Sequence, residues 1–475
     1  MKAFSKKRIV LGIILLVIFL VGGFILSKAH LLRQGAIGAG YKAHILCSGV
    51  FVSGRDPESI LREDLSFHPS FDLLKAKVDY GGKSVTASLF GLVKAQAVFR
   101  EGIGTTLMAG RKTGQFLSQA VRRVPPIPEN PESIPWPRGD QISTDDIPPN
   151  VDLRRLHRAL NRAFDETEPE RLKRTRALVV VYDGRLVAER YAHGLKKETP
   201  LIGWSMTKSV TNALVGILVK ENKLALEDYV NVPEWKGKGD ARCRITLDQL
   251  LRMSSGLKFV EEYEGNPVSD VNRMLFTQAD MAAFAASMPL EAEPDTRWHY
   301  SSGTTNIIQR IIRQAFSSHE CYVSFPRRAL FNRLGMRSAV LEMDASGTFI
   351  GSSFMFASAR DWARIGLLFM QDGIWEGERI LPEGWVAYST TPTPMAPLGE
   401  YGAHLWLNRG NPENPEERLF PKLPEDAFFM LGYQHQNVVI IPARRLVVVR
   451  LGMTLSDGIW DLEAFISDVL IAIGE

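Results

Sequence analysis

The chain has 475 residues, of which 45% are hydrophobic and 23% charged, a composition typical of globular proteins. Its 57 basic and 53 acidic residues leave a net charge of +4 and form no basic block, which argues against nucleic acid as a partner. The three cysteines have neither metal-ligand nor redox spacing. At roughly 100–200 residues per domain, this length predicts two or three structural units.

The N-terminus predicts a membrane anchor within residues 1–30. Ile9–Leu26 is an uninterrupted run of 18 uncharged residues, and as a helix it would extend about 27 Å, close to the ~30 Å hydrocarbon core of a bilayer. The basic residues before this run predict a cytoplasmic N-terminus, with the rest of the chain on the extracytoplasmic (periplasmic) side. A cleaved signal peptide is the alternative, although its apolar core usually spans only about 7–15 residues.

Residues 34–124 form a separate accessory segment with some β-structure. Lys77–Phe90 has the pattern of a hairpin around Gly81-Gly82, and Ala95–Arg100 could add a strand. No residue pattern in this segment indicates a chemistry, so we expect a small accessory module or collar.

Residues 125–150 are rich in proline. Eight of the 26 prolines in the chain lie between Pro125 and Pro149, and so many missing amide donors exclude a regular helix or a central strand. This segment should be an extended linker, or a strap that lies on a neighbouring surface with Trp136 as its anchor.

The remaining residues, 151–475, predict an α+β domain. A strong turn signal at Asp183-Gly184 indicates a hairpin near the start, and two apolar runs, Val438–Ile441 and Leu446–Leu451, indicate strands near the end. Residues from Ser205 to about 380 have mostly helical and loop character. We therefore expect an antiparallel sheet built from both ends of the domain and flanked by helices, with a mostly helical insertion.

Ser205-Met206-Thr207-Lys208 is the stretch that points most directly to a chemistry. It begins an apolar segment with helical spacing, and residues three apart on a helix share a face. A serine hydroxyl becomes a good nucleophile only when a base removes its proton. Burial and the positive end of the helix dipole would both favour a neutral Lys208 that could act as that base.

Two further motifs follow in the chain. Tyr300-Ser301-Ser302-Gly303 precedes a helical segment; its tyrosine could shuttle protons if positive charge stabilised the phenolate, and Ser302 could bind Lys208 or the substrate. Taken alone, this motif could equally be a helix cap beside a half-buried aromatic ring. Gly432-Tyr433-Gln434-His435-Gln436 directly precedes a strand, where backbone amides could stabilise an oxyanion.

In this order, the three motifs resemble those of the serine β-lactamase and penicillin-binding protein superfamily. The closest resemblance is to the branch with class C β-lactamases, esterases and 6-aminohexanoate-dimer hydrolases. Three segments carry the resemblance, which covers residues 150–475: Ser205-Met206-Thr207-Lys208-Ser209, Leu250-Leu251-Arg252-Met253-Ser254-Ser255-Gly256-Leu257 and Trp298-His299-Tyr300-Ser301-Ser302-Gly303.

The resemblance implies a β-lactamase/transpeptidase-like fold and a catalytic role for each motif. Ser205 would be the acylated nucleophile, Lys208 its base, and Tyr300 the group that relays a proton to the leaving group or helps activate the deacylating water. The amide of Ser205 and one near Gln436 would form the oxyanion hole, with Ser302, Gln434 and His435 as further substrate contacts. No metal or organic cofactor is implied.

Two departures from the family pattern affect the expected substrate. Ser302 stands where β-lactamases usually have Asn, and the last motif lacks the Lys-Thr-Gly or His-x-Gly form, with His435 at the glycine position. The ring of His435 would narrow the space that a fused bicyclic lactam needs. The missing lysine removes a cation that would pair with the carboxylate of the drug, so both changes argue against β-lactam breakdown as the native role. His435 could bind substrate or tune Tyr300, or it could be a structural histidine that caps a turn, whereas His299 and His404 are expected at half-exposed polar positions.

We therefore expect a membrane-anchored, exported serine hydrolase of small or peptide-like esters or amides. One alternative is a non-catalytic relative that binds peptidoglycan fragments or a partner protein. Another is a D-alanyl carboxypeptidase of the cell wall.

Overall fold

The computed structural model describes residues 29–110, 131–143, 147–166, 168, 171–411, 413–414 and 416–474. The predicted anchor, Ile9–Leu26, lies outside these residues. Among the helices that are described, none is both long and apolar enough to cross a bilayer.

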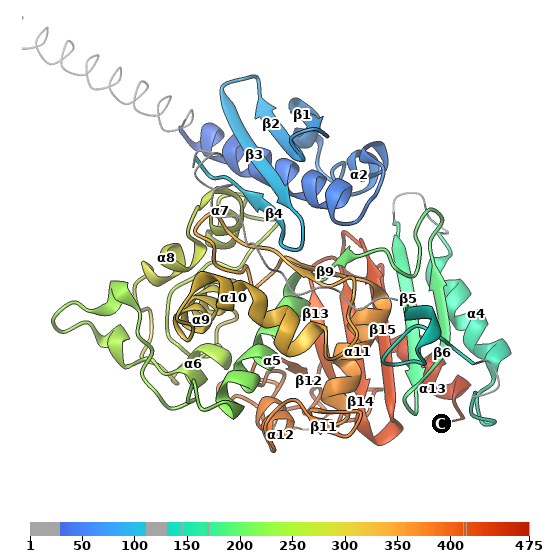
Figure 1. Ribbon diagram of the computed structural model, residues 1–475. Helices are drawn as coiled ribbons and strands as arrows, with labels where there is room; N and C mark the ends of the chain where they lie inside the picture. The colour runs from blue at the N-terminus through green and yellow to red at the C-terminus, as the bar shows by residue number, and fades with distance from the viewer. Residues whose placement is uncertain are drawn as a thin grey trace, which may run out of the picture.

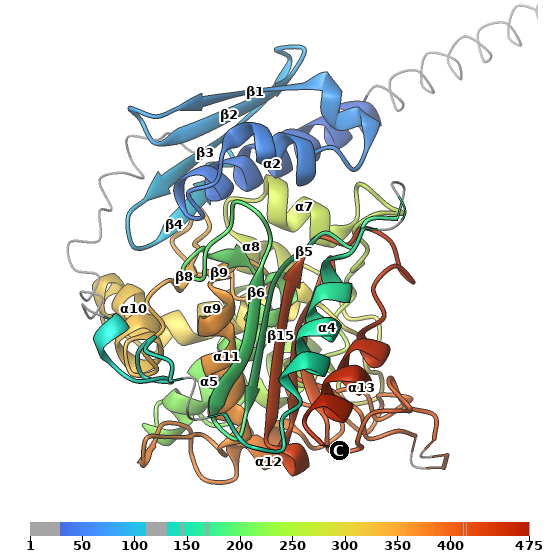
Figure 2. The same ribbon diagram turned by 90° about the vertical axis from the view of Figure 1, so that its right-hand side faces the viewer.

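A six-stranded antiparallel sheet forms the centre of the large domain (Figures 1 and 2). Its strand order is β12-β13-β14-β15-β5-β6, so strands from the two ends of the domain meet where β15 pairs with β5, with Val447 opposite Val181. This arrangement confirms the predicted α+β fold with an antiparallel sheet built from both ends. The strands are β5 Thr175–Tyr182, β6 Arg185–Tyr191, β12 Trp406–Leu407, β13 Phe428–Gly432, β14 Gln436–Ile441 and β15 Leu446–Gly452.

Both faces of this sheet are covered, which explains why β5 is buried along its whole length. Alternate residues of a strand point to opposite faces, and accordingly Leu178 and Val180 belong to one apolar cluster while Val179 and Val181 belong to another. Helices α4 (Leu153–Phe164) and α13 (Leu462–Ala472) cover the first face, and α11 (Ala359–Met370) covers the second.

A mostly helical region lies between β6 and β12, as predicted. Short strands and a 3-10 turn, η4 (Trp204–Met206), accompany its helices. The helices are α5 Thr207–Lys220, α6 Leu247–Leu251, α7 Asp270–Thr277, α8 Met281–Ala286, α9 Ser302–Gln314, α10 His319–Pro326 and α12 Trp385–Ser389. The short strands are β7 Leu201–Ile202, β8 Val340–Leu341, β9 Met355–Ala357, β10 Ile374–Trp375 and β11 Glu378–Arg379.

The N-terminal module comprises residues 29–110. It begins with a helix over residues 29–51 and continues with α2 (Pro57–Glu63) and the 3-10 turn η1 (Pro69–Leu73). An antiparallel meander in the order β1-β2-β3-β4 completes it, and its first hairpin is the one predicted around Gly81-Gly82. The strands are β1 Leu74–Asp79, β2 Ser84–Leu89, β3 Val93–Arg100 and β4 Gly104–Leu107.

The helix over residues 29–51 lies between this small sheet and the large domain (Figure 2). On one side the Cys47 thiol contacts the carbonyl of Ala97 in β3 at 3.7 Å. On the other side Gly40 lies against α7, so closely that a Cβ there would be 2.1 Å from the carbonyl oxygen of Phe276. The module is therefore packed directly against the large domain.

Two buried polar clusters join the module to the large domain. In the first, Glu342 accepts hydrogen bonds from Ser48 Oγ at 2.8 Å and from the amide of Thr105 at 2.7 Å, and its carboxylate lies 2.6 Å from His44 Nε2. In the second, Arg176 of β5 binds Asp64 at 2.6 Å. Buried polar groups need hydrogen-bonding partners. Glu342 and Arg176 of the large domain find theirs in the N-terminal module.

Residues 131–143 lie on the large domain. The Trp136 indole donates to the carbonyl of Gly184 at 3.0 Å, and the guanidinium of Arg364 lies 4.7 Å from the centre of its ring. Arg364 also donates to the carbonyls of Pro137 and Gly139, both at 2.6 Å. Trp136 thus anchors this part of the proline-rich segment.

Candidate active site

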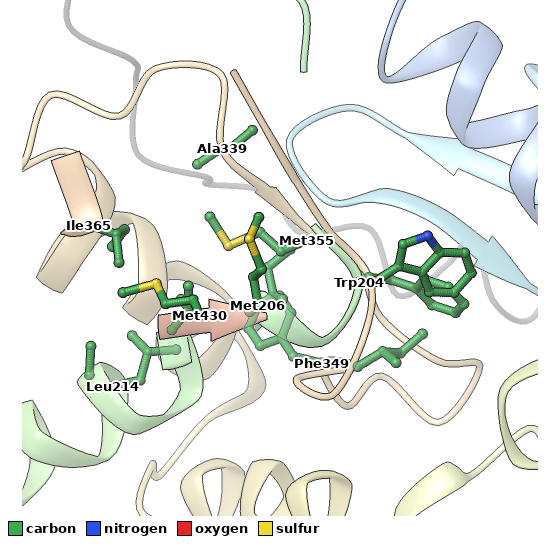
Figure 3. Close-up of a cluster of buried hydrophobic side chains, with 14 of the residues drawn as sticks. Trp204, Met206, Leu214, Ala339, Phe349, Met355, Ile365 and Met430 are labelled. Atoms are coloured by element: carbon green, nitrogen blue, oxygen red, sulfur yellow. The ribbon is translucent and has the colours of Figure 1, made fainter. Parts of the chain in front are cut away.

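Ser205 lies in the turn η4, between strand β7 and helix α5. The prediction put it on the first turn of an α-helix, but the α-helix begins only at Thr207. The turn is tight: a Cβ on Gly203 would be 2.1 Å from the ring of Trp362, and Trp204 has a left-handed backbone with φ of 46°. Apolar side chains pack behind it, among them Met206 and Met355 (Figure 3).

Lys208 is buried beneath the serine, with only 1% of its surface exposed. Its Nζ lies 3.0 Å from Ser205 Oγ, 2.9 Å from Ser302 Oγ and 3.1 Å from the carbonyl oxygen of Ser352. Burial lowers the pKa of Lys208 to about 8, against a smaller opposing effect of the negative charge on Glu261. The amine is therefore neutral in a larger fraction of molecules near neutral pH than an ordinary lysine, and this neutral form can accept a proton.

Tyr300 completes the group around the serine. The Lys208 amine lies 4.7 Å from the centre of the Tyr300 ring, and the phenol is a close neighbour of the Ser205 side chain. Burial raises the pKa of Tyr300, and the charge of Glu261 raises it further. The expected phenolate is therefore disfavoured, and Tyr300 is a neutral phenol that can donate a proton or pass one on.

Glu261 is a charged neighbour of the site, and the sequence analysis did not identify it. Its carboxylate accepts hydrogen bonds from the amide of Ser302 at 2.7 Å and from its hydroxyl at 2.5 Å. Glu261 thus fixes the hydroxyl that faces Lys208. It is one of three acidic residues in Glu261-Glu262-Tyr263-Glu264, and no spacing in the sequence distinguishes it.

His404 lies below Lys208 and is buried, whereas the sequence predicted a half-exposed position. Its ring contacts the carbonyl of Lys208 at 3.1 Å and the hydroxyl of Thr305 at 3.2 Å. Burial, together with the charge of Lys208, lowers the pKa of His404 to about 3. The imidazole is therefore neutral and adds no positive charge beside the lysine.

The third motif forms the turn between β13 and β14. Gln434 and His435 both have left-handed backbones, with φ of 62° and 59°. The turn lies close to η4, since a Cβ on Gly432 would be 2.2 Å from the carbonyl oxygen of Gly203. Backbone amides of this turn therefore lie near the nucleophile's turn, as an oxyanion hole requires.

The side chains of Gln434, His435 and Gln436, which the sequence placed at the substrate, differ from one another in their surroundings. Gln434 accepts a hydrogen bond from the Trp204 indole at 3.1 Å, next to the serine. Gln436 donates to the carbonyl of Gly452 at 2.6 Å, and His435 lies 3.5 Å from the exposed Asp457. Burial lowers the pKa of His435. Ser302 and Gln434 thus lie beside Lys208 and Trp204, while His435 and Gln436 make their contacts elsewhere; the substrate roles of all four stay predictions.

Comparison with known proteins gives the same family as the motifs. The Beta-lactamase family model matches residues 164–456, more than half of the chain. The 6-aminohexanoate-dimer hydrolase of Paenarthrobacter ureafaciens is 25% identical over 305 residues, which cover 58% of this chain and 72% of that enzyme.

Solved structures share the fold. A candidate 6-aminohexanoate-dimer hydrolase from Bacillus anthracis is similar with a TM-score of 0.53 and 23% identity, covering 63% of this chain and 79% of that one. EstCE1, a hydrolase with promiscuous acyltransferase activity, has a TM-score of 0.52 and 16% identity, covering 68% and 98%. Together with the family match, these similarities show that the chain belongs to the beta-lactamase family and is a serine hydrolase.

Proposed function

We propose that this chain cleaves an ester or an amide through an acyl-enzyme formed on Ser205. The observation that carries the proposal is the 3.0 Å contact between Ser205 Oγ and a buried Lys208 whose pKa is lowered to about 8. A non-catalytic binding protein would gain nothing from a desolvated amine beside a serine, because such an amine costs stability.

Acylation follows from these contacts. Neutral Lys208 takes the proton of Ser205 as the serine oxygen attacks the substrate carbonyl. The amide of Ser205 and an amide of the turn after β13 donate to the oxyanion, a contribution of about 2.7–4 kcal/mol for each donor in a characterised protease. When the tetrahedral intermediate collapses, the leaving group takes a proton from the Tyr300 phenol, which is replenished from protonated Lys208. Water then cleaves the acyl-enzyme by the reverse proton transfers.

The substrate class is a small or peptide-like ester or amide rather than a β-lactam. One relative is named a 6-aminohexanoate-dimer hydrolase, and EstCE1 is named a hydrolase with promiscuous acyltransferase activity. The last motif carries Tyr433, Gln434 and His435 and no lysine that could pair with the carboxylate of a β-lactam. A D-alanyl carboxypeptidase activity is the second candidate, tested by product analysis on D-Ala-D-Ala peptides.

The proposed location of the hydrolase domain, at a membrane, rests on the sequence alone. The uncharged run Ile9–Leu26 and the basic residues before it support a membrane anchor with the hydrolase domain on the periplasmic side. Alkaline extraction of membranes, with protease accessibility of the hydrolase domain in intact spheroplasts, tests this proposal.

Labelling with a fluorophosphonate probe tests the function. We expect the probe to label the wild type, and Ser205→Ala to lose both labelling and hydrolysis of p-nitrophenyl acetate by at least about 1,000-fold. Ser287→Ala, which removes an exposed serine outside the site, is the matched control and should be labelled like the wild type. Labelling that persists in Ser205→Ala, or a wild type that neither reacts nor turns over ester or amide substrates, would contradict the proposal.

A further inference from the structure

A cavity of about 470 Å³ lies between the N-terminal helix and the hydrolase domain. This volume is in the range of small-molecule binding sites. Most of the cavity lining is apolar. The helix over residues 29–51 and the turn η1 contribute one wall, and the hydrolase domain contributes the other. The principal apolar side chains are Ile37, Phe71, Leu74, Tyr263, Phe276 and Tyr433.

Much of this cavity is built by residues outside the family match. The wall formed by residues 31–89 precedes the first matched residue, 164. On the helix, Gly35 and Gly38 face the cavity, where larger side chains would occupy part of the space. The N-terminal module therefore adds a binding surface to the hydrolase domain that the family match itself does not include.

The inner end of the cavity is lined by two tyrosines, one of which packs against the residue before the catalytic serine. Tyr263 and Tyr433 line it and stack on one another, with ring centroids 4.8 Å apart. Tyr433 also contacts the ring of Trp204 at 5.5 Å, and Trp204 precedes Ser205. Tyr263 and Tyr433 thus lie at the end of the cavity nearest to Trp204 and Ser205.

The outer end of the cavity is apolar and open. Leu31 and Leu73 line it and are 60% and 53% exposed. Leu89 also lines it, and the next apolar residues of that hairpin, Phe90 and Leu92, are 72% and 81% exposed. Exposed apolar residues gathered around one opening are uncommon on soluble proteins and indicate a binding surface.

The polar groups of the cavity restrict what can bind there. Glu264 lies in the lining and accepts a hydrogen bond from the Tyr433 phenol at 2.6 Å. A carboxylate in this position repels an anionic group such as that of a free fatty acid. The occupant should therefore be an uncharged apolar chain whose polar part lies outside the cavity, toward Ser205.

We propose that this cavity binds the apolar chain of the substrate, and that the substrates are esters or amides with a long straight acyl or alkyl chain. This inference rests on the proposed function, because it assigns the chain of the molecule that Ser205 attacks. The chain lies between Leu31 and Leu73 at the open end of the cavity and Tyr263 and Tyr433 at its inner end, and it passes beside these two rings to its carbonyl at Ser205.

A chain-length series tests the inference with the full-length protein in detergent. The substrates are p-nitrophenyl acetate, butyrate, octanoate and dodecanoate, each below its critical micelle concentration. Burial of each additional CH₂ is expected to raise kcat/KM by up to about fourfold. We expect octanoate to exceed butyrate by at least tenfold, and a flat or falling series would overturn the proposal.

Gly38→Leu tests whether the cavity causes that preference. The added side chain would fill space beside Leu74, whose Cδ1 is 3.1 Å from the position of a Cβ. We expect the ratio of kcat/KM for dodecanoate over acetate to fall at least tenfold. Ala36→Leu adds the same side chain on the same helix at a residue that does not line the cavity, and should keep the ratio.

Three results would separate the possible failures. Equal losses on both esters in Gly38→Leu, with an unchanged melting temperature, would overturn the chain site while leaving the hydrolase intact. A chain preference that emerges only after removal of residues 1–28 would mean that the cavity holds this chain's own N-terminus. Absence of fluorophosphonate labelling in the wild type would instead overturn the proposed function.

Discussion

Lys208 and Glu342 are both almost completely buried, yet their surroundings differ. Glu342 has three close partners, the side chains of His44 and Ser48 and the amide of Thr105, and all three belong to the N-terminal module. The hydrogen bonds of the Lys208 amine all go to neutral oxygens, those of Ser205, Ser302 and Ser352. The closest carboxylate in its network, Glu261, is reached through the hydroxyl of Ser302.

This difference separates a structural role from a chemical one. A buried carboxylate surrounded by hydrogen-bonding partners is costly to disrupt, so Glu342 holds two units together. A buried amine without a directly bound carboxylate is destabilised in its charged form, so Lys208 has a lowered pKa and can act as a base. Substitutions at the two residues should therefore affect different properties.

Lys208→Met should produce the largest effect, and it should affect catalysis rather than stability. Loss of a general base typically lowers the rate by about 10²–10⁴-fold. We expect kcat on p-nitrophenyl acetate to fall within or beyond that range, with no decrease in melting temperature because an apolar side chain replaces a buried amine.

Lys42→Met is the matched control for this substitution, since Lys42 is also buried and donates to the carbonyls of Phe71 and Leu74. It should lower the melting temperature and keep kcat within about threefold of wild type, because only backbone hydrogen bonds in the module are lost. If Lys208→Met kept more than a tenth of the wild-type kcat, Lys208 would not be the base.

Glu342→Ala should produce the opposite result, a loss of stability. The change leaves Ser48, His44 and the amide of Thr105 without their partner, and we expect the free energy of unfolding to fall by about 3–5 kcal/mol. Urea unfolding followed by tryptophan fluorescence measures this loss. Glu63→Ala, at a carboxylate that is 41% exposed, should cost less than about 1 kcal/mol; an equal effect of the two substitutions would contradict the role of Glu342.

Glu261→Gln should produce the smallest effect, a shift in the pH dependence. Activity requires neutral Lys208, so kcat/KM of the wild type should rise with pH through about 8, the pKa of that amine. The charge of Glu261 raises this pKa, and removing the charge should therefore move the rising limb to lower pH. Glu262→Gln, at the exposed neighbour, should leave the profile in place, and a shift of the Glu261→Gln profile to higher pH would refute the assignment.

The local part of the site could be predicted from the sequence. Ser205 and Lys208 are three residues apart, and a 3-10 turn that continues into a helix keeps them on one side just as an α-helix would. Tyr300 and Ser302 could be assigned to the same site only because their motif resembles one in a known family. The hairpin at Asp183-Gly184 has its own turn signal and was predicted correctly.

The contacts that depend on tertiary packing could not be predicted. Glu261 reaches Ser302 across 41 positions of the chain, and nothing near it in the sequence marks it. His404 is a polar loop residue whose burial results from contacts with α5 and α9. The position of the N-terminal module was likewise unpredictable, because Glu342 and its partner His44 are 298 positions apart.

The packing of Tyr41 on Trp204 determines how small a working version of this protein can be. The Tyr41 ring lies 6.4 Å from that of Trp204, and His44 stacks on Phe354 at 4.2 Å. A shortened chain that starts at residue 164, where the family match begins, would expose both aromatic surfaces next to the nucleophile. We therefore expect the smallest autonomously folding unit to extend beyond residues 164–456, and expression trials should retain residues 29–110.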